Sequence, residues 1–164
     1  MPPAPYFDVS QLDLNKVVAD KETIRKVNPQ RFEMEQLDAI VFVDPTQHLV
    51  AGYKDVRPDE FWVRGHMPDY PLMPGVLICE AAAQLCSYYI SAQKLMGGDF
   101  MGFGGLENVR FRKPVYPGNR LVLLGKAIKM HRRQTVCNVQ GFVKNHMVFH
   151  GDILAVPLFR GGEG

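Results

Sequence analysis

The hydrophobic and polar positions along the chain predict two strands, one long helix and four further strands. Residues 36–44 and 47–56 are β-branched and apolar, and Pro45-Thr46 joins them in the manner of a hairpin turn. Residues 75–96 are apolar almost all round in their first half, which is typical of a helix buried on every side. The further strands are expected at residues 100–111, 121–131, 135–143 and 147–158.

The order of these elements predicts an α+β domain in which an antiparallel β-sheet wraps a long central α-helix. Short turns join the last strands, and such links favour antiparallel neighbours. We expect a single domain over residues 21–160, which starts with a short helix at residues 20–27 with Asp20 as its N-cap. Residues 1–20 open with Pro-rich sequence and are expected to form an N-terminal extension that packs loosely on the domain.

The segment that precedes the long helix is stiffened by four prolines between residues 58 and 74. Proline fixes its own φ and restricts the residue before it, so this loop suits the task of positioning a side chain. The long helix is expected to begin after Pro74 and to end before Gly97 and Gly98, because proline suits a first turn and glycine a C-terminal stop.

Length and composition place the chain among ordinary globular domains. It has 164 residues, of which 46% are hydrophobic, and a formal net charge of +2. Its cysteines, Cys79, Cys86 and Cys137, are odd in number, so we expect reduced core residues of a cytoplasmic protein. The first twenty residues do not read as a secretory signal, and no run of about 18 apolar residues predicts a membrane span.

Charge is distributed unevenly along the chain. Residues 1–64 carry 8 Lys and Arg against 11 Asp and Glu, whereas residues 105–145, called here the basic segment, carry 9 against one. Such a segment can meet an acidic partner, or its charges can simply lie on solvated strand faces. Nucleic acid is not expected as a partner, because aromatic residues are sparse there and no recognition helix is available.

Neither a metal nor a cofactor site is expected. His146 and His150 are four apart, but on a turn and a strand this spacing does not put them on one face. No cysteine or carboxylate cluster joins them. The glycines of residues 102–105 lie inside a strand and lack the lysine and the helix of a phosphate-binding loop.

The stretch "GHMPDYPLMPGVLICEAAAQL", residues 65–85, raises a chemical question, because the carboxylate of Glu80 stands among apolar residues. An apolar setting disfavours the charged form, so Glu80 is expected to hold a proton near neutral pH and to act as a general acid. Gln84, one helical turn later, can fix its orientation. His66 on the proline-stiffened loop can act as a base.

The start of the helix supplies a third chemical element. Gly75 has no side chain, so a ligand can approach its backbone, and the first amides of a helix are unpaired at the positive end of the dipole. A carbonyl oxygen that becomes negative would be stabilised there. A base, an acid and an oxyanion site describe removal of a proton α to a carbonyl and loss of a β-hydroxyl as water. A polar loop histidine and a glutamate paired with an arginine are the alternatives that spacing alone leaves open.

The same stretch resembles the signature of the (3R)-hydroxyacyl-[acyl-carrier-protein] dehydratases of type II fatty acid synthesis. That pattern is G-H-F-P, a few residues, P-x-M-P-G-V-L and then E-A-x-A-Q. Residues 28–32, "NPQRF", are similar to the entry motif L-P-H-R-[FY], and residues 109–121, "VRFRKPVYPGNRL", are similar to F-[KR]-[KR]-P-V-x-P-G-D-x-L. About residues 24–157 are covered by the resemblance.

The resemblance implies a hotdog fold and an enzyme that dehydrates (3R)-hydroxyacyl chains on acyl carrier protein to trans-2-enoyl chains, without a cofactor. It implies homodimers, which can assemble as trimers of dimers, with His66 of one chain facing Glu80 of the other. His66 would be the base, and Glu80 would protonate or orient the leaving water. The implied substrate-binding residues are Gly75, Val76, Gln84 and Phe103.

Departures from the family pattern are few. Met67 replaces the usual Phe after the histidine, Gln30 replaces the usual His of the entry motif, and Gly102 stands where many members carry a bulky aromatic. Glu80 favours a dehydratase over the related dehydratase/isomerases, which usually carry Asp. The other functions considered are a non-catalytic acyl-binding protein of the same fold and a thioesterase or hydratase that acts on acyl-CoA.

Overall fold

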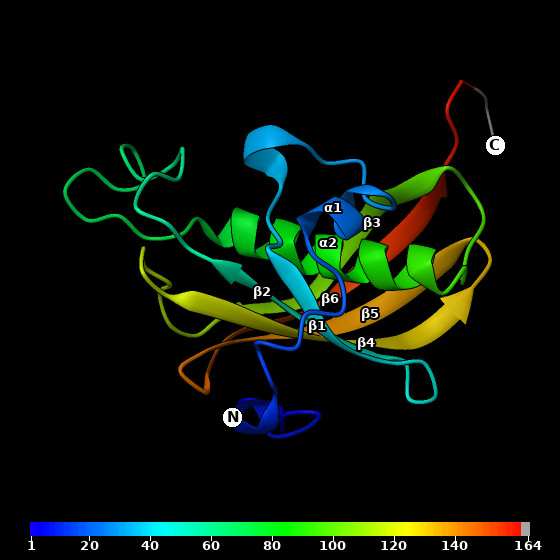
Figure 1. The fold of residues 1–164 in the computed structure, drawn as a ribbon, viewed down its shortest axis with the longest axis horizontal. Helices are drawn as coiled ribbons and strands as arrows, with labels where there is room; N and C mark the ends of the chain where they lie inside the picture. Colours follow the sequence, from blue (N-terminus) through cyan, green and yellow to red (C-terminus); the bar gives the residue numbers. More distant parts are fainter. Residues whose placement is uncertain (162–164) are drawn as a thin grey trace.

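The computed structural model describes residues 1–161 and contains one long helix and six strands (Figure 1). A short helix, α1 (Lys21–Arg25), comes first, and the strands β1 (Ala39–Asp44) and β2 (Leu49–Asp55) form a hairpin. The long helix α2 (Gly75–Ala92) follows. The last four strands are β3 (Phe100–Phe111), β4 (Arg120–His131), β5 (Gln134–Val143) and β6 (His146–Leu158).

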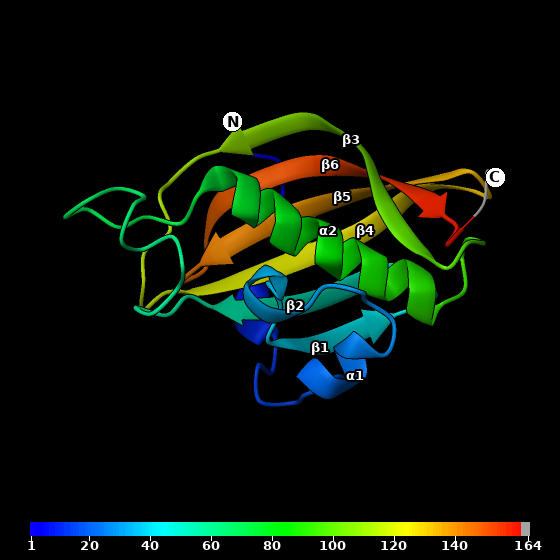
Figure 2. The same ribbon diagram turned by 90° about the horizontal axis from the view of Figure 1, so that it is seen from above.

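The six strands form one antiparallel sheet in the order β1-β2-β4-β5-β6-β3. The sheet curves around α2, with β3 along one side of the helix and β1 along the other (Figure 2). The predicted sheet wrapped around a central helix is therefore confirmed. The last four strands lie within one residue of their expected bounds, whereas β1 begins three residues later than expected.

The long helix ends at Ala92, and the expectation that it continues to Met96 was wrong. Lys94 adopts a φ of 53°, in the left-handed region, and its N–H donates to the Ser91 carbonyl. The next N–H, of Leu95, donates to the Ile90 carbonyl. This pair of bonds ends a helix in the way that usually requires glycine, and here a lysine fills the position.

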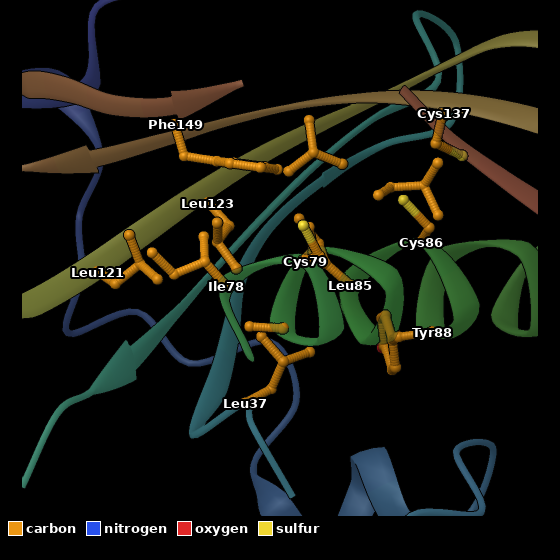
Figure 3. Close-up of a cluster of buried hydrophobic side chains, with 14 of the residues drawn as sticks. Leu37, Ile78, Cys79, Leu85, Cys86, Tyr88, Leu121, Leu123, Cys137 and Phe149 are labelled. Carbon is orange, nitrogen blue, oxygen red and sulfur yellow. The ribbon is translucent and has the colours of Figure 1, made fainter. Parts of the chain in front are cut away.

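The concave face of the sheet packs on α2 and forms the main core (Figure 3). Leu85 and Cys86 of the helix belong to this core together with Leu121, Leu123 and Phe149 of the sheet, all of them 1% exposed or less. The three cysteines are buried and free, as the sequence predicts. Burial of such apolar side chains stabilises the fold by roughly 1.5–3 kcal/mol for each large residue.

Part of the N-terminal extension packs on the convex face of the sheet. A second apolar cluster forms there, in which Val9 is buried and Phe7 packs on Phe42. Tyr6 donates its hydroxyl to Asn138 Oδ1 at 2.7 Å, and its N–H donates to Gln140 Oε1 at 3.2 Å. Most residues of the extension remain exposed, and these few side chains attach it to the half-apolar outer face of the sheet.

Among residues 1–161, no helix has the length and apolar character that a membrane crossing requires. Within the same residues, no three side chains of His, Cys, Asp or Glu gather in an arrangement that could hold a metal ion.

Candidate functional site

The start of α2 opens onto an apolar cavity of about 460 Å³. Gly75 and Val76 line it from the helix, and Phe111 covers Gly75 so closely that a Cβ there would lie 2.8 Å from the phenyl ring. The first N–H groups of a helix have no acceptor within it, so those of Gly75 and Val76 are available to a ligand. The cavity therefore combines apolar walls with backbone donors at the positive end of a helix.

Two cations stand at the same cavity. Arg112 and Lys113 line it, and both belong to the basic segment. Arg112 Nη2 lies 2.9 Å from His150 Nε2, and because a guanidinium only donates, the imidazole accepts there. Burial, followed by the charges of Arg112 and Arg110, lowers the pKa of His150, so this histidine does not add to the positive charge at neutral pH.

Glu80 lies five residues further along α2, about 7.5 Å along the helix axis from Gly75. Its neighbours Cys79 and Ala81 are buried, but the carboxylate itself is only half-buried in a single chain. Gln84 Nε2 donates to Glu80 Oε1 at 2.7 Å. The side chain that the sequence singled out as an orienting group therefore contacts the carboxylate.

Gln84 is itself held on every side. Its Nε2 also donates to the Met34 carbonyl at 2.6 Å, and its Oε1 accepts the Gln36 N–H at 2.8 Å. Asn28 Nδ2 donates to the Gln84 backbone carbonyl at 2.9 Å. These bonds tie α2 to residues 28–36, so Gln84 cannot turn away from Glu80 without leaving buried polar groups unpaired.

His66 lies on the loop between β2 and α2, which extends beyond the start of the helix (Figure 2). The ring atom Nδ1 of His66 lies 2.8 Å from the Leu72 carbonyl oxygen, and the backbone N–H of His66 donates to the Trp62 carbonyl. A carbonyl can only accept, so Nδ1 carries a proton. In the neutral imidazole Nε2 then has the free lone pair, which is the state that a general base requires.

The structure does not join His66 and Glu80 within one chain: across residues 1–161 no hydrogen bond links them. Glu80 belongs instead to an open stripe on α2 that includes Ala83 and Val76, of which Val76 is 76% exposed. The His66 loop is also exposed at Met67 and Tyr70. Both halves of the candidate site thus present unpaired apolar surface beside a polar group.

Phe103 lies apart from the cavity. It pairs with Ala155 of β6, whose side chain belongs to the main core, so it is on the helix-facing side of the edge strand β3. Eight residues separate it from Phe111, which is about 26 Å of extended strand. Phe103 therefore lies on the helix-facing side of β3 but does not line the cavity at Gly75.

The sequence did not predict a buried ion pair where β2 leads into the His66 loop. This end of the loop is called its root. Lys54 Nζ lies 2.9 Å from Glu60 Oε1, and the two side chains are 6% and 9% exposed. Strand alternation could have indicated it, because the side chain of Lys54 lies on the same side of β2 as that of the core residue Val50. An inward-facing lysine in a core strand needs a partner, and Glu60 is an acid of the adjoining loop.

The buried thiols next to the site are not reactive groups. Burial raises the pKa of the Cys79 thiol, one residue before Glu80, and burial raises that of Cys86 as well. A thiol that stays protonated is a poor nucleophile. Neither thiol is therefore a candidate nucleophile.

Comparison with known proteins places the chain in a family. Residues 28–152 match the FabA-like domain. The 3-hydroxyacyl-[acyl-carrier-protein] dehydratase FabZ of Clostridium kluyveri is 30% identical over 133 residues, which are 81% of this chain and 92% of the relative. The protein of the same name from Acinetobacter baumannii is 37% identical over 114 residues, which are 68% and 77% of the two chains.

Solved structures share the fold at lower identity. The dehydratase heterocomplex ApeI:P from Xenorhabdus doucetiae has a TM-score of 0.68 and 14% identity, and the match covers 82% of this chain and 90% of that one. Cj0977, a sigma28-regulated virulence protein from Campylobacter jejuni, has a TM-score of 0.63 and 20% identity over 85% and 93% of the two chains. The chain belongs to the FabA-like family and has the hotdog fold.

Proposed function

We propose that the protein dehydrates (3R)-hydroxyacyl chains carried by acyl carrier protein to trans-2-enoyl chains, in fatty acid synthesis in the cytoplasm. The two relatives described above are named 3-hydroxyacyl-[acyl-carrier-protein] dehydratases, and the match to the FabA-like domain spans most of the chain. The observation that carries the proposal is the bond of His66 Nδ1 to the Leu72 carbonyl, because it leaves Nε2 as the base. No electrons are transferred in this reaction, so it needs no redox cofactor.

In the proposed reaction His66 Nε2 takes the proton from the α-carbon of the substrate. The electron pair moves into the Cα–Cβ bond, the Cβ–O bond breaks, and the departing hydroxyl takes a proton from Glu80. Water and the enoyl thioester are the products, and a proton returns from His66 to Glu80 through solvent. Gln84 supports the role of Glu80 because its saturated contacts keep the carboxyl in one orientation.

The thioester oxygen gains negative charge as the α-proton leaves, and the N–H of Gly75 is the proposed donor to it. Support comes from the cavity, where the backbone of Gly75 and Val76 meets apolar walls. From there the acyl chain would run along the helix-facing side of β3 towards Phe103. The apolar side chains of that face, Phe103, Leu106 and Phe111, are about half exposed in one chain, as the wall of a shared channel would be.

The proposed site is completed by a second copy of the chain, so that His66 of one protomer acts with Glu80 of the other. The open stripe of Val76, Glu80 and Ala83 supports this, because an exposed apolar helix face beside an acid needs a cover. The unpaired outer edge of β3 is a second surface available to a partner. Homodimers of this kind could associate further as trimers of dimers.

The proposed partner, acyl carrier protein, is acidic, and the basic segment offers it a surface. Arg112 and Lys113 are the leading candidates, with Arg110, because the first two line the cavity beside Gly75. Among the described residues none of the three forms a salt bridge with an acid. Cations without an acidic partner beside the cavity would raise the rate of encounter with an anionic carrier.

Hydration of crotonyl thioesters, the reverse reaction, tests the proposal through loss of the enoyl absorbance. Crotonyl carrier protein and crotonyl-CoA are compared at equal concentration. Hydration of the carrier-linked ester is expected, and its absence would overturn the proposal. Release of free thiol would indicate a thioesterase, hydration of the CoA ester alone would indicate a CoA hydratase, and acyl binding without turnover would indicate a non-catalytic acyl-binding protein.

Mixed chains test the shared site. His66→Ala and Glu80→Gln proteins are each expected to be inactive, but mixing them should restore activity, since every mixed dimer contains one intact site. Subunit exchange is verified by native mass spectrometry. Complete exchange without recovered activity would show that the site lies within one chain.

A further inference from the structure

The tip of the His66 loop is a tight turn that projects from the protein. Pro68 and Asp69 occupy its centre, and Met67 and Tyr70 exchange two backbone hydrogen bonds of 3.0 and 3.1 Å. Asp69 has a φ of 60°, which a carboxyl side chain tolerates better than most. All four residues are exposed, so packing into the core does not hold this turn.

The exposed turn is joined to the rest of the protein by a pair of tyrosines. The hydroxyl of Tyr70 lies 2.7 Å from the hydroxyl of Tyr116, and the two rings meet edge to face with centroids 5.9 Å apart. The hydrogen bond between them raises the pKa of Tyr116 above its ordinary value. Both hydroxyls can therefore serve as donor or acceptor.

The contact connects the two segments that border the cavity at Gly75. On one side, Tyr70 is followed by Leu72 and Met73, which line the cavity. On the other side, Tyr116 follows Val115, which also lines it and accepts the Met73 N–H at 2.7 Å. The tyrosine pair thus lies where the His66 loop meets the loop between β3 and β4.

We propose that Tyr70 and Tyr116 form a latch that positions His66, by holding the tip of its loop against the β3–β4 loop. This inference rests on the function proposed above for His66. The ring of His66 is oriented by the Leu72 carbonyl, and the Leu72 N–H in turn donates to the His66 carbonyl. Leu72 is two residues from Tyr70, so a tip that moves carries the acceptor of Nδ1 with it.

The root of the loop shows why a latch at the tip is needed. The root is fixed by buried groups, with Glu60 paired to Lys54 and Trp62 only 4% exposed. No comparable burial exists between residues 67 and 70. Without the hydroxyl pair, the tip would retain its own backbone bonds and the contact between the two rings, and it could move more freely about the root.

Single-atom changes test the latch. Tyr70→Phe and Tyr116→Phe each remove one hydroxyl but keep the ring contact, and either one breaks the same hydrogen bond. Each is expected to lower kcat for crotonyl thioester hydration about fivefold to tenfold, with KM changed less than twofold. The double variant should be no worse than either single one, since residues that act through one shared bond are not additive.

Tyr53→Phe is the matched control. Tyr53 lies on β2 with its ring under the Arg120 guanidinium, and its hydroxyl has no hydrogen-bond partner within the described part of the chain. The control should keep wild-type kcat. Rate losses in the two single variants that multiply in the double variant would overturn the latch, because they would show two independent effects.

A second measurement does not depend on activity. Hydrogen exchange at the amides of residues 66–72 should be faster in Tyr70→Phe and Tyr116→Phe than in the wild type, while the amides of α2 stay protected. Trp62, the one tryptophan of the sequence, reports on the intact root through its fluorescence. If the wild-type protein proves inactive, the proposed function fails, yet faster exchange would still support the latch; unchanged exchange at residues 66–72 would overturn it.

Discussion

The two halves of the candidate site are held in different ways. Glu80 stands on a long helix at the centre of the fold, and the amide that orients it makes two further side-chain bonds to residues 34 and 36. His66 lies on the loop that precedes this 18-residue helix, outside the core. There the Leu72 carbonyl orients its ring. One group is oriented by a buried amide on the central helix, and the other by a few loop contacts.

This difference separates precision from mobility. Sites built on helices are more precise than sites on loops, whereas loops that carry functional groups belong to the least stable parts of a fold. We therefore expect that damage around Glu80 mainly disturbs its orientation, and that damage around the loop of His66 releases the whole segment. Four sets of variants test or sharpen this contrast.

Removal of either reacting group should have the largest effect on activity. His66→Ala and Glu80→Gln are each expected to lower kcat by about two to four orders of magnitude, as is typical for a general base or acid. Both proteins should remain folded by circular dichroism. His146→Ala and Glu22→Gln change an exposed histidine and an exposed glutamate and should be neutral. A nearly wild-type rate in either site variant would show that its proposed role is wrong.

The ion pair at the root of the His66 loop should have the largest effect on stability. Glu60→Gln leaves Lys54 buried without its charged partner, which is expected to cost about 3–5 kcal/mol of unfolding free energy. For a chain of this size the melting temperature should fall by about 10 °C. The double variant Lys54→Met with Glu60→Leu should recover most of it, because a buried apolar pair needs no charge compensation.

Recovered stability in that double variant sharpens the comparison. If the ion pair serves only to stabilise the fold, activity should return together with the melting temperature. If it also sets the position of the loop, kcat should stay below the wild-type value. An unchanged melting temperature in Glu60→Gln would show that Lys54 finds another partner or reaches water.

Loss of the Gln84 amide should have an intermediate effect. Gln84→Leu leaves the Gln36 N–H and the Met34 carbonyl without their partner, at a cost of about 1–3 kcal/mol. The rate is expected to fall about tenfold because Glu80 loses its orienting bond. Gln134→Leu, an exposed glutamine on β5, is the control. Lost stability with a full rate would mean that Gln84 is structural and does not act through Glu80.

Charge reversal at the cavity should have the smallest effect on the fold. Arg112→Glu or Lys113→Glu is expected to raise KM for the carrier-linked substrate several-fold and to leave kcat for that substrate nearly unchanged, because surface charge acts mainly on the rate of encounter. The KM for a CoA substrate should also stay nearly unchanged. Added salt should weaken the wild-type enzyme in the same way, over a screening length of about 8–10 Å. Lys26→Glu makes the same charge change away from the cavity. Equal effects on both substrates would show that the basic segment does not serve the carrier.

Much of the site could be predicted from the sequence because its parts are local. The spacing of Glu80 and Gln84 puts them one turn apart on any helix, and the structure has a hydrogen bond between them. The proline-rich loop and the helix start at Gly75 are also local features. The partners of Gln84 come from residues 34 and 36, about 50 residues earlier in the chain, and no short-range pattern indicates them.

By itself the sequence determined the periodicity of each element, and with it one buried helix, the antiparallel strands and the free core cysteines. Side-chain spacing along a helix or a strand follows from backbone geometry, so these features need no knowledge of the neighbours. Only the tertiary structure decided that Lys54 meets Glu60, that Tyr70 meets Tyr116, and that part of the N-terminal extension packs on the convex face. Such contacts depend on where the curved sheet brings separate loops, and that is set by the packing of all elements together.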